Sequence, residues 1–312
     1  MRVHWTDARM SPRKWLKATF LTLFFLAWVY AIARPMLQTY LLAHPHRQAA
    51  ELTPATAGGP VERVSFRATD GVELVGWFVP AVADGATVVV SHGSGANGPS
   101  TYAGVAFLSD AGYNVFVFDH RAHGQSAGQA TTLGPREVRD LLGAVAYLRS
   151  RPDVDPHRIG AIGCSMGSGV VIGAAAEDEA IRAVVAESVF ADMATLWDRF
   201  GYTGIKGTSL HWSWGLPMRW ATWLWTGEWN ASFRPEELIG CITPRPVLII
   251  HGQEDNAACT VADAERLYRA AREPKDLWIV AGAGHCAAHA AQRQPYEDRV
   301  LLFFDQALRD DS

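Results

Sequence analysis

A serine between two glycines is the feature of this sequence that most directly predicts chemistry. The segment from Gly163 to Gly167, GCSMG, follows an apolar strand pattern and precedes a helical pattern that continues to Glu177. Glycines on both sides of Ser165 permit a very tight turn, which carries the serine hydroxyl out of the sheet edge. The amide of Met166 then lies at a helix N-terminus, where negative charge is stabilised. The pattern predicts a nucleophile beside half of an oxyanion hole.

The same glycine-serine-glycine pattern occurs a second time, around Ser126. Such a motif counts only in the right structural context. The residues that follow it, up to Pro135, open no helix. We therefore expect Ser126 to be a loop residue and Ser165 to be the nucleophile.

An acid and a base follow two later strands of the expected sheet. Asp255 comes just after the apolar strand 245–251, and His285 comes just after the strand 276–281. Sites in open parallel sheets lie outside the carboxyl ends of the strands, so both side chains are expected at the edge that carries Ser165. His285 would take the serine proton, and Asp255 would stabilise the imidazolium.

Three other residues compete for these two roles. Glu254 is one step off Asp255 and should point away from the site, and Glu187 ends an earlier strand. His289 lies one helical turn after His285, where its side chain should turn back to the sheet. Asp255 and His285 are therefore preferred.

The glycine-rich loop 92–98, HGSGANG, follows the buried strand 86–91. It lacks the spacing and the Gly-Lys-Ser/Thr ending of phosphate-binding loops. We expect the backbone amide of Ser94 to face that of Met166 and to complete the oxyanion hole. The alternative is a plain flexible turn.

The remaining strands and helices predict the scaffold. Two alternating runs, 61–68 and 72–79, surround Asp-Gly and predict a hairpin. Apolar strands then alternate with helical patterns, which predicts a mostly parallel sheet with helices on both faces. In the turn 119–124 we expect Arg121 and His123 to brace the site loops by hydrogen bonds.

Five motifs together resemble the α/β-hydrolase superfamily, close to its esterase, lipase and serine-aminopeptidase-like members. They occur in the family's order, at residues 92–95, 119–126, 163–167, 251–255 and 282–285. The resemblance extends from residue 61 to the C-terminus. It implies an eight-stranded sheet in a domain 61–312, a helical cap inserted at about 189–243, and serine hydrolase activity through an acyl-enzyme, without a cofactor or a metal.

The expected cap is rich in tryptophan. Seven of the twelve tryptophans lie between residues 188 and 243. Trp220, Trp223 and Trp225 are expected to wall an apolar acyl pocket. Alternatively, the tryptophans make the cap's own core, or they anchor the cap at a lipid interface.

The first 43 residues predict a membrane segment. Five basic residues up to Lys17 precede a charge-free apolar run, 18–33. An uncleaved anchor with the hydrolase domain outside the cytoplasm is the favoured interpretation. The alternatives are a signal peptide cleaved near Ala33 and a buried helix of the domain. Residues 44–60 are expected to be a linker.

Composition narrows the remaining functions. The chain has 312 residues and a net charge of −4, and its folded part has no basic block, so no nucleic-acid partner is expected. The four cysteines have no metal-ligand spacing, and no metal site is expected. Cys259 and Cys286 each lie near a predicted site loop and could form a disulfide outside the cytoplasm.

The favoured function is hydrolysis of a small-molecule or lipid-like carboxylic ester by a membrane-anchored serine hydrolase. A serine peptidase, an aminopeptidase-like enzyme or a thioesterase could use the same three residues. A catalytically silent binding protein with this fold is a further alternative, because a fold does not fix a function.

Overall fold

The computed structural model describes residues 11–81, 85–204, 211–256 and 259–309. Its centre is an eight-stranded sheet in the order β1-β2-β4-β3-β5-β6-β9-β10. β2 pairs antiparallel with both of its neighbours, and every other pairing in this sheet is parallel. The strands are β1 (Glu62–Arg67), β2 (Glu73–Val79), β3 (Thr87–Ser91), β4 (Asn114–Phe118), β5 (Ile159–Cys164), β6 (Ile181–Glu187), β9 (Val247–Gly252) and β10 (Lys275–Val280). The predicted hairpin and the mostly parallel sheet are confirmed.

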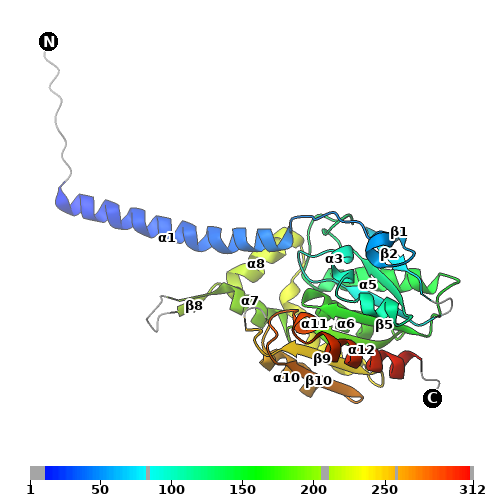
Figure 1. Ribbon diagram of the computed structural model, residues 1–312. Helices are drawn as coiled ribbons and strands as arrows, with labels where there is room; N and C mark the ends of the chain where they lie inside the picture. Colours follow the sequence, from blue (N-terminus) through cyan, green and yellow to red (C-terminus); the bar gives the residue numbers. More distant parts are fainter. Residues whose placement is uncertain (1–10, 82–84, 205–210, 257–258, 310–312) are drawn as a thin grey trace, which may run out of the picture.

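Helices cover both faces of the sheet, as predicted (Figure 1). Successive residues of a strand point to opposite faces, and in β3 Val89 belongs to one hydrophobic core whereas Val88 and Val90 belong to the other. The helices of the first face are α5 (Pro135–Arg149), α6 (Met166–Glu177) and α10 (Val261–Ala270). Those of the second are α3 (Gly98–Tyr102), α4 (Ala106–Asp110), α11 (Ala288–Ala291) and α12 (Arg293–Leu308).

A cap connects β6 to β9, within the range expected for the insertion. It consists of α7 (Met193–Gly201), β7 (Tyr202–Gly204), β8 (His211–Ser213), α8 (Gly215–Thr226), η1 (Asn230–Ser232), α9 (Pro235–Leu238) and η2 (Ile239–Cys241). Trp197 is buried and donates its indole N–H to Asn230 Oδ1 at 3.0 Å. This tryptophan therefore belongs to the core of the cap.

The N-terminal helix α1 (Pro12–Ala43) extends away from the domain and meets α8 with its C-terminal part (Figure 1). Among the described residues it is the one helix that is long and apolar enough to cross a membrane. The first ten residues, which carry two of the five basic residues of the predicted flank, lie outside the described part. The last turns of α1 are not free: Pro35, Thr39 and Ala43 are buried against the domain.

Residues 44–60, expected to be a linker, are fixed to the surface of the domain. Arg47 Nη1 donates to the carbonyl of Ser126 at 2.6 Å, and Trp77 Nε1 donates to Glu51 Oε2 at 3.2 Å. A short helix, α2 (Pro54–Ala57), forms within the segment. The low apolar content of the segment predicted a spacer, but hydrogen bonds such as these two hold it on the domain.

Candidate active site

Ser165 lies in a strained turn between β5 and α6. Its φ of 56° and ψ of −119° fall in a region that few non-glycine residues adopt. The turn also requires glycine beside it, because a Cβ on Gly167 would lie 2.0 Å from the carbonyl oxygen of Ser91 in β3. The tight turn predicted from the glycine spacing is thus present, and it ends the strand with the hydroxyl at the sheet edge.

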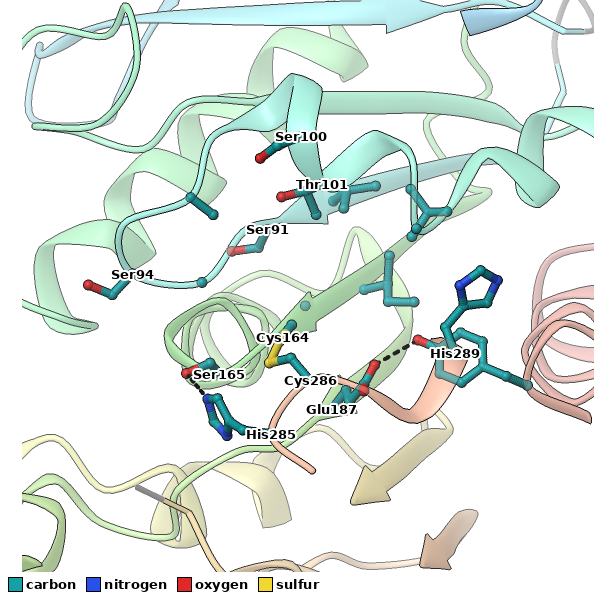
Figure 2. Close-up of a pocket in the computed structure, with 18 residues that line it drawn as sticks. Ser91, Ser94, Ser100, Thr101, Cys164, Ser165, Glu187, His285, Cys286 and His289 are labelled. Carbon is teal, nitrogen blue, oxygen red and sulfur yellow. Dashed lines mark hydrogen bonds between the residues drawn. A yellow bond between two sulfur atoms is a disulfide. The ribbon is translucent and has the colours of Figure 1, made fainter. Parts of the chain in front are cut away.

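The structure brings Ser165, His285 and Asp255 into one hydrogen-bonded chain (Figure 2 shows Ser165 and His285). His285 Nε2 lies 2.9 Å from Ser165 Oγ, and His285 Nδ1 lies 2.7 Å from Asp255 Oδ2. A carboxylate only accepts, so Nδ1 carries the proton and Nε2 accepts from the serine hydroxyl. The Asp255 side chain is buried, whereas that of His285 is one-third exposed. This geometry suits proton transfer from serine to imidazole.

The competing acids and base make other contacts. Glu187 accepts hydrogen bonds from the Ala288 amide and from Tyr296 Oη, both at 3.0 Å. His289 Nε2 lies 2.9 Å from Glu297 Oε1 of α12. Glu254 is exposed to solvent. Glu187 therefore supports the segment that follows His285, and its hydrogen bonds go to Ala288 and Tyr296 and not to the His285 imidazole.

The second serine motif is structural. Ser126 Oγ accepts from the Val75 amide at 2.9 Å and donates to the Asp119 carbonyl at 2.5 Å. These bonds tie the loop after β4 to β2. Ser126 is fully buried, and it lies in a loop as predicted.

A cluster of imidazoles braces the loop that contains Ser94. His123 Nε2 accepts from the Gly95 amide at 3.1 Å, and His92 Nε2 accepts from the His120 amide at 2.9 Å. Burial lowers the pKa of His92 well below its ordinary value, and the nearby imidazoles of His120 and His123 lower it further. The neutral rings can therefore act as acceptors, and the bracing predicted for His123 is confirmed.

Arg121 anchors the turn 119–124 to the rest of the domain. Its guanidinium bonds to both carboxylate oxygens of Asp70 at 2.8 Å and to Asp140 Oδ1 at 2.7 and 2.8 Å. Such bidentate pairs fix orientation as well as distance. The structural role predicted for Arg121 is present.

Two cavities meet at Ser165. The large cavity, of about 380 Å³, is lined by Ser94, Ser165 and His285 among others (Figure 2). The small cavity, of about 60 Å³, is lined by Ser94, Ser165 and Met166, and otherwise by apolar side chains and Cys259. Ser94 and Met166 thus both lie beside the nucleophile, at the small cavity. A donor role for their amides stays a prediction.

A disulfide joins the residue before Ser165 to the residue after His285. Cys164 and Cys286 are bonded with their Cα atoms 6.0 Å apart (Figure 2). The sequence had left open a disulfide between Cys259 and Cys286, and the structure does not form it: Cys259 is free and buried. When His285 reaches Ser165, the residues that flank the two meet, and this adjacency could have identified the pair from the sequence.

The cap tryptophans occupy a different place from the one predicted. Trp225 Nε1 donates to the Met36 carbonyl of α1 at 3.2 Å, and Trp220 and Trp223 line an apolar groove between α8 and α1. None of the three is among the described residues that line either cavity at Ser165. Because α1 packs on α8, it turns these rings away from the nucleophile.

The apolar wall next to Ser165 comes from residues that the sequence did not single out. It is formed by Leu42, Leu133, Phe190, Leu196 and Phe200. Two of them belong to α7 of the cap and one to α1. Only the docking of α1 and α7 on the sheet edge could reveal them.

Within the described part of the chain no group of three or more His, Cys, Asp or Glu side chains could hold a metal ion.

Comparison with known proteins agrees with this architecture. The uncharacterized protein YfhR of Escherichia coli (strain K12) is 31% identical over 255 residues, which cover 79% of this chain and 81% of YfhR. The structure of the Pyrococcus furiosus esterase Pf2001 superposes with a TM-score of 0.71 at 26% identity, over 86% of this chain and 98% of that one.

A larger enzyme shares the fold alone. The Pyrococcus horikoshii acylaminoacyl peptidase matches with a TM-score of 0.59 at 19% identity, over 81% of this chain but 42% of that one. The model of the prolyl oligopeptidase family matches residues 99–311. This match spans more than half of the sequence, and the chain, with its α/β-hydrolase fold, belongs to the prolyl oligopeptidase family.

Proposed function

We propose that this protein is a serine hydrolase that cleaves carboxylic esters through an acyl-enzyme on Ser165. The observation that carries the proposal is the hydrogen-bonded chain from Asp255 through His285 to Ser165 at a strained turn. A nucleophile, a base within hydrogen-bond reach and a group that orients the base are the parts that covalent catalysis needs.

The reaction has two halves. Ser165 Oγ attacks the ester carbonyl while His285 Nε2 takes its proton, and Asp255 stabilises the resulting imidazolium. The amides of Ser94 and Met166 hold the oxyanion, and each such donor contributes about 3 kcal/mol to the transition state. His285 then protonates the departing alcohol. Water, activated by the same imidazole, releases the acid.

The comparisons favour an ester over a peptide as the substrate. The Pyrococcus furiosus esterase is covered almost completely by this chain, at 98% of its length. The acylaminoacyl peptidase has more than half of its length without a counterpart here, since 42% of it is covered. Peptide hydrolysis is the alternative outcome, because the family to which the chain belongs is named for a peptidase.

Loss of the nucleophile is the direct test. Ser165→Ala should lower kcat on p-nitrophenyl esters on the order of 10⁵-fold and abolish labelling by a fluorophosphonate probe. Ser126→Ala, in the second motif, should still be labelled at residue 165. Faster turnover of aminoacyl anilides than of esters would favour a peptidase, and full turnover by Ser165→Ala would contradict the proposal.

We also propose that α1 anchors the enzyme in a membrane, with the hydrolase domain outside the cytoplasm. No residue of the apolar run of α1 is buried, and the Cys164–Cys286 disulfide favours an oxidising compartment. Trp220 and Trp223 line an apolar groove beside Trp28 of α1, which supports the interpretation that they anchor the cap at a lipid interface. Cleavage near Ala33 is the alternative.

A further inference from the structure

The two cavities at Ser165 differ in one chemically decisive residue. His285 lines the large cavity, whereas among the described residues the small cavity is lined by Ser94, Ser165 and Met166 without His285. The imidazole gives its proton to the leaving group, so the leaving group must lie on the side of the imidazole.

The acyl group is thereby directed to the other side. It remains bonded to Ser165 Oγ after the alcohol departs, with its oxygen at the amides of Ser94 and Met166. Both of these residues line the small cavity. The chain of the acyl group therefore extends into the small cavity, and the alcohol occupies the large cavity.

The small cavity is lined in part by a residue of the N-terminal helix. Leu42, in the last turn of α1, lines the space beside Ser165 together with Leu133 and with Phe190, Leu196 and Phe200 of the segment between β6 and β9. These side chains offer no hydrogen bond to a polar acyl group. Burying a polar group there would cost free energy, whereas an apolar chain is stabilised.

Leu42 is held in place on both sides of its own position. The Thr131 amide donates to the carbonyl of Ala43 at 2.8 Å, and Thr39, one turn earlier, is fully buried. The loop that makes this bond is itself fixed, because the buried Glu137 accepts from Thr131 Oγ1 at 2.9 Å and from the Thr132 amide at 3.0 Å. The wall is therefore rigid at Leu42.

We propose that the small cavity is the acyl site, that it takes a short apolar acyl group, and that Leu42 of α1 sets the length accepted. The inference rests on the proposed function. The small cavity, of about 60 Å³, has about one-sixth of the volume of the large cavity, of about 380 Å³, so a short chain fits beside Ser165 and a long one does not.

The test is the acyl-length profile of the full-length protein in detergent micelles. On p-nitrophenyl esters from acetate to octanoate, the wild type should have its highest kcat/KM at acetate or propionate. Leu42→Ala should raise the ratio of kcat/KM for hexanoate over acetate at least about tenfold, at about fourfold for each additional buried methylene. Phe200→Ala, which removes another side chain of the same cavity wall, should shift the ratio in the same direction.

Leu41→Ala is the matched control. Leu41 lies on the same helix, and its side chain is 59% exposed, so the profile should not change. An unchanged profile in both Leu42→Ala and Phe200→Ala, with normal melting temperatures, would overturn the assignment. A wild-type preference for octanoate would do the same.

A second readout separates this inference from ester hydrolysis itself. Methyl and hexyl fluorophosphonates bond to the Ser165 oxygen as fluoride leaves and the serine proton passes to His285. Intact mass then measures the adduct without turnover. Leu42→Ala should accelerate hexyl labelling relative to methyl labelling even if esters are poor substrates. Labelling without this change would refute the acyl site alone, and no labelling at all would refute the hydrolase as well.

Discussion

Glu187 shows how a single carboxyl group can support the site without taking part in proton transfer. It ends β6 with its side chain buried, and it receives one hydrogen bond from the amide of Ala288, the first residue of α11, and one from Tyr296 of α12. Burial raises the pKa of Glu187, against these two hydrogen bonds, which lower it. At pH values between the unfolded and the folded pKa of Glu187, the folded protein therefore retains a proton that the unfolded chain has lost.

This shift predicts a pH dependence of stability. Above the unfolded value of 4.5, the unfolded chain releases the Glu187 proton while the folded chain keeps it. The free energy of unfolding should then fall as pH rises from that value through the raised folded pKa. Glu187→Gln cannot ionise and keeps both contacts, so this part of the fall should disappear.

Urea unfolding at intervals between pH 4 and 8 measures the effect as the difference between the two proteins. Other groups titrate equally in both and cancel in that difference. A constant difference across the range would show that Glu187 ionises alike in the folded and unfolded states.

At the level of single residues, the positions of Ser165, Asp255 and His285 could be predicted because each follows the end of a parallel strand. Strand order then places them at one edge whatever the loops do in detail. The partner of Cys286 was missed for a different reason. The pairing follows from the contact between Ser165 and His285, which brings their neighbours Cys164 and Cys286 together, and not from the spacing of the cysteines along the chain.

At the level of elements, the disulfide links the turn of the nucleophile to the loop of the imidazole. It closes a separation of 122 residues that includes the whole cap. The Cys164→Ser, Cys286→Ser double variant should lower the free energy of unfolding by about 2–4 kcal/mol, because the unfolded chain gains freedom when a long loop is opened.

The control for the double variant is Cys241→Ser, since Cys241 is exposed and free. Its unfolding curve in urea should match that of the wild type. Dithiothreitol should move the wild type toward the double variant and leave the double variant unchanged. Equal stability of the wild type and the double variant would contradict the expectation.

The contact between α1 and α8 is the element-level feature that the sequence did not predict. Residues 18–33 are apolar without a charged face, so periodicity gave no sign of which side packs on protein. The tryptophans of α8 were therefore assigned to a pocket at Ser165. In the structure they face α1, with Tyr40 and Trp225 ring centroids 5.1 Å apart.

At the level of the whole molecule, the proposed topology predicts chemical access to Cys241. Its thiol is exposed and free, whereas Cys259 is buried. A membrane-impermeant maleimide should therefore label the protein in intact spheroplasts of a bacterial expression host, and Cys241→Ser should lose the label. The intact mass of the protein from the membrane fraction should correspond to a chain that retains residue 1. Carbonate washing should not release the protein from the membrane.

Labelling only after lysis would place the domain in the cytoplasm. A mature protein that begins at Arg34 would show that the apolar segment is a cleaved signal. Neither result would alter the acyl site, because Leu42 lies beyond the cleavage position.

The helix α1 continues without interruption from its apolar run to the wall of the small cavity. A domain joined to its membrane helix by a flexible linker can tilt and move away from the lipid. Here the same helix is the proposed membrane anchor and forms part of the cavity wall, so the domain cannot move away in this manner. Arg34 and Leu42 are separated by about 12 Å, at about 1.5 Å per residue. Once α1 spans a bilayer, the catalytic centre lies at a fixed, short distance from the lipid surface. Large folded substrates are therefore sterically excluded, whereas small esters can diffuse to the site.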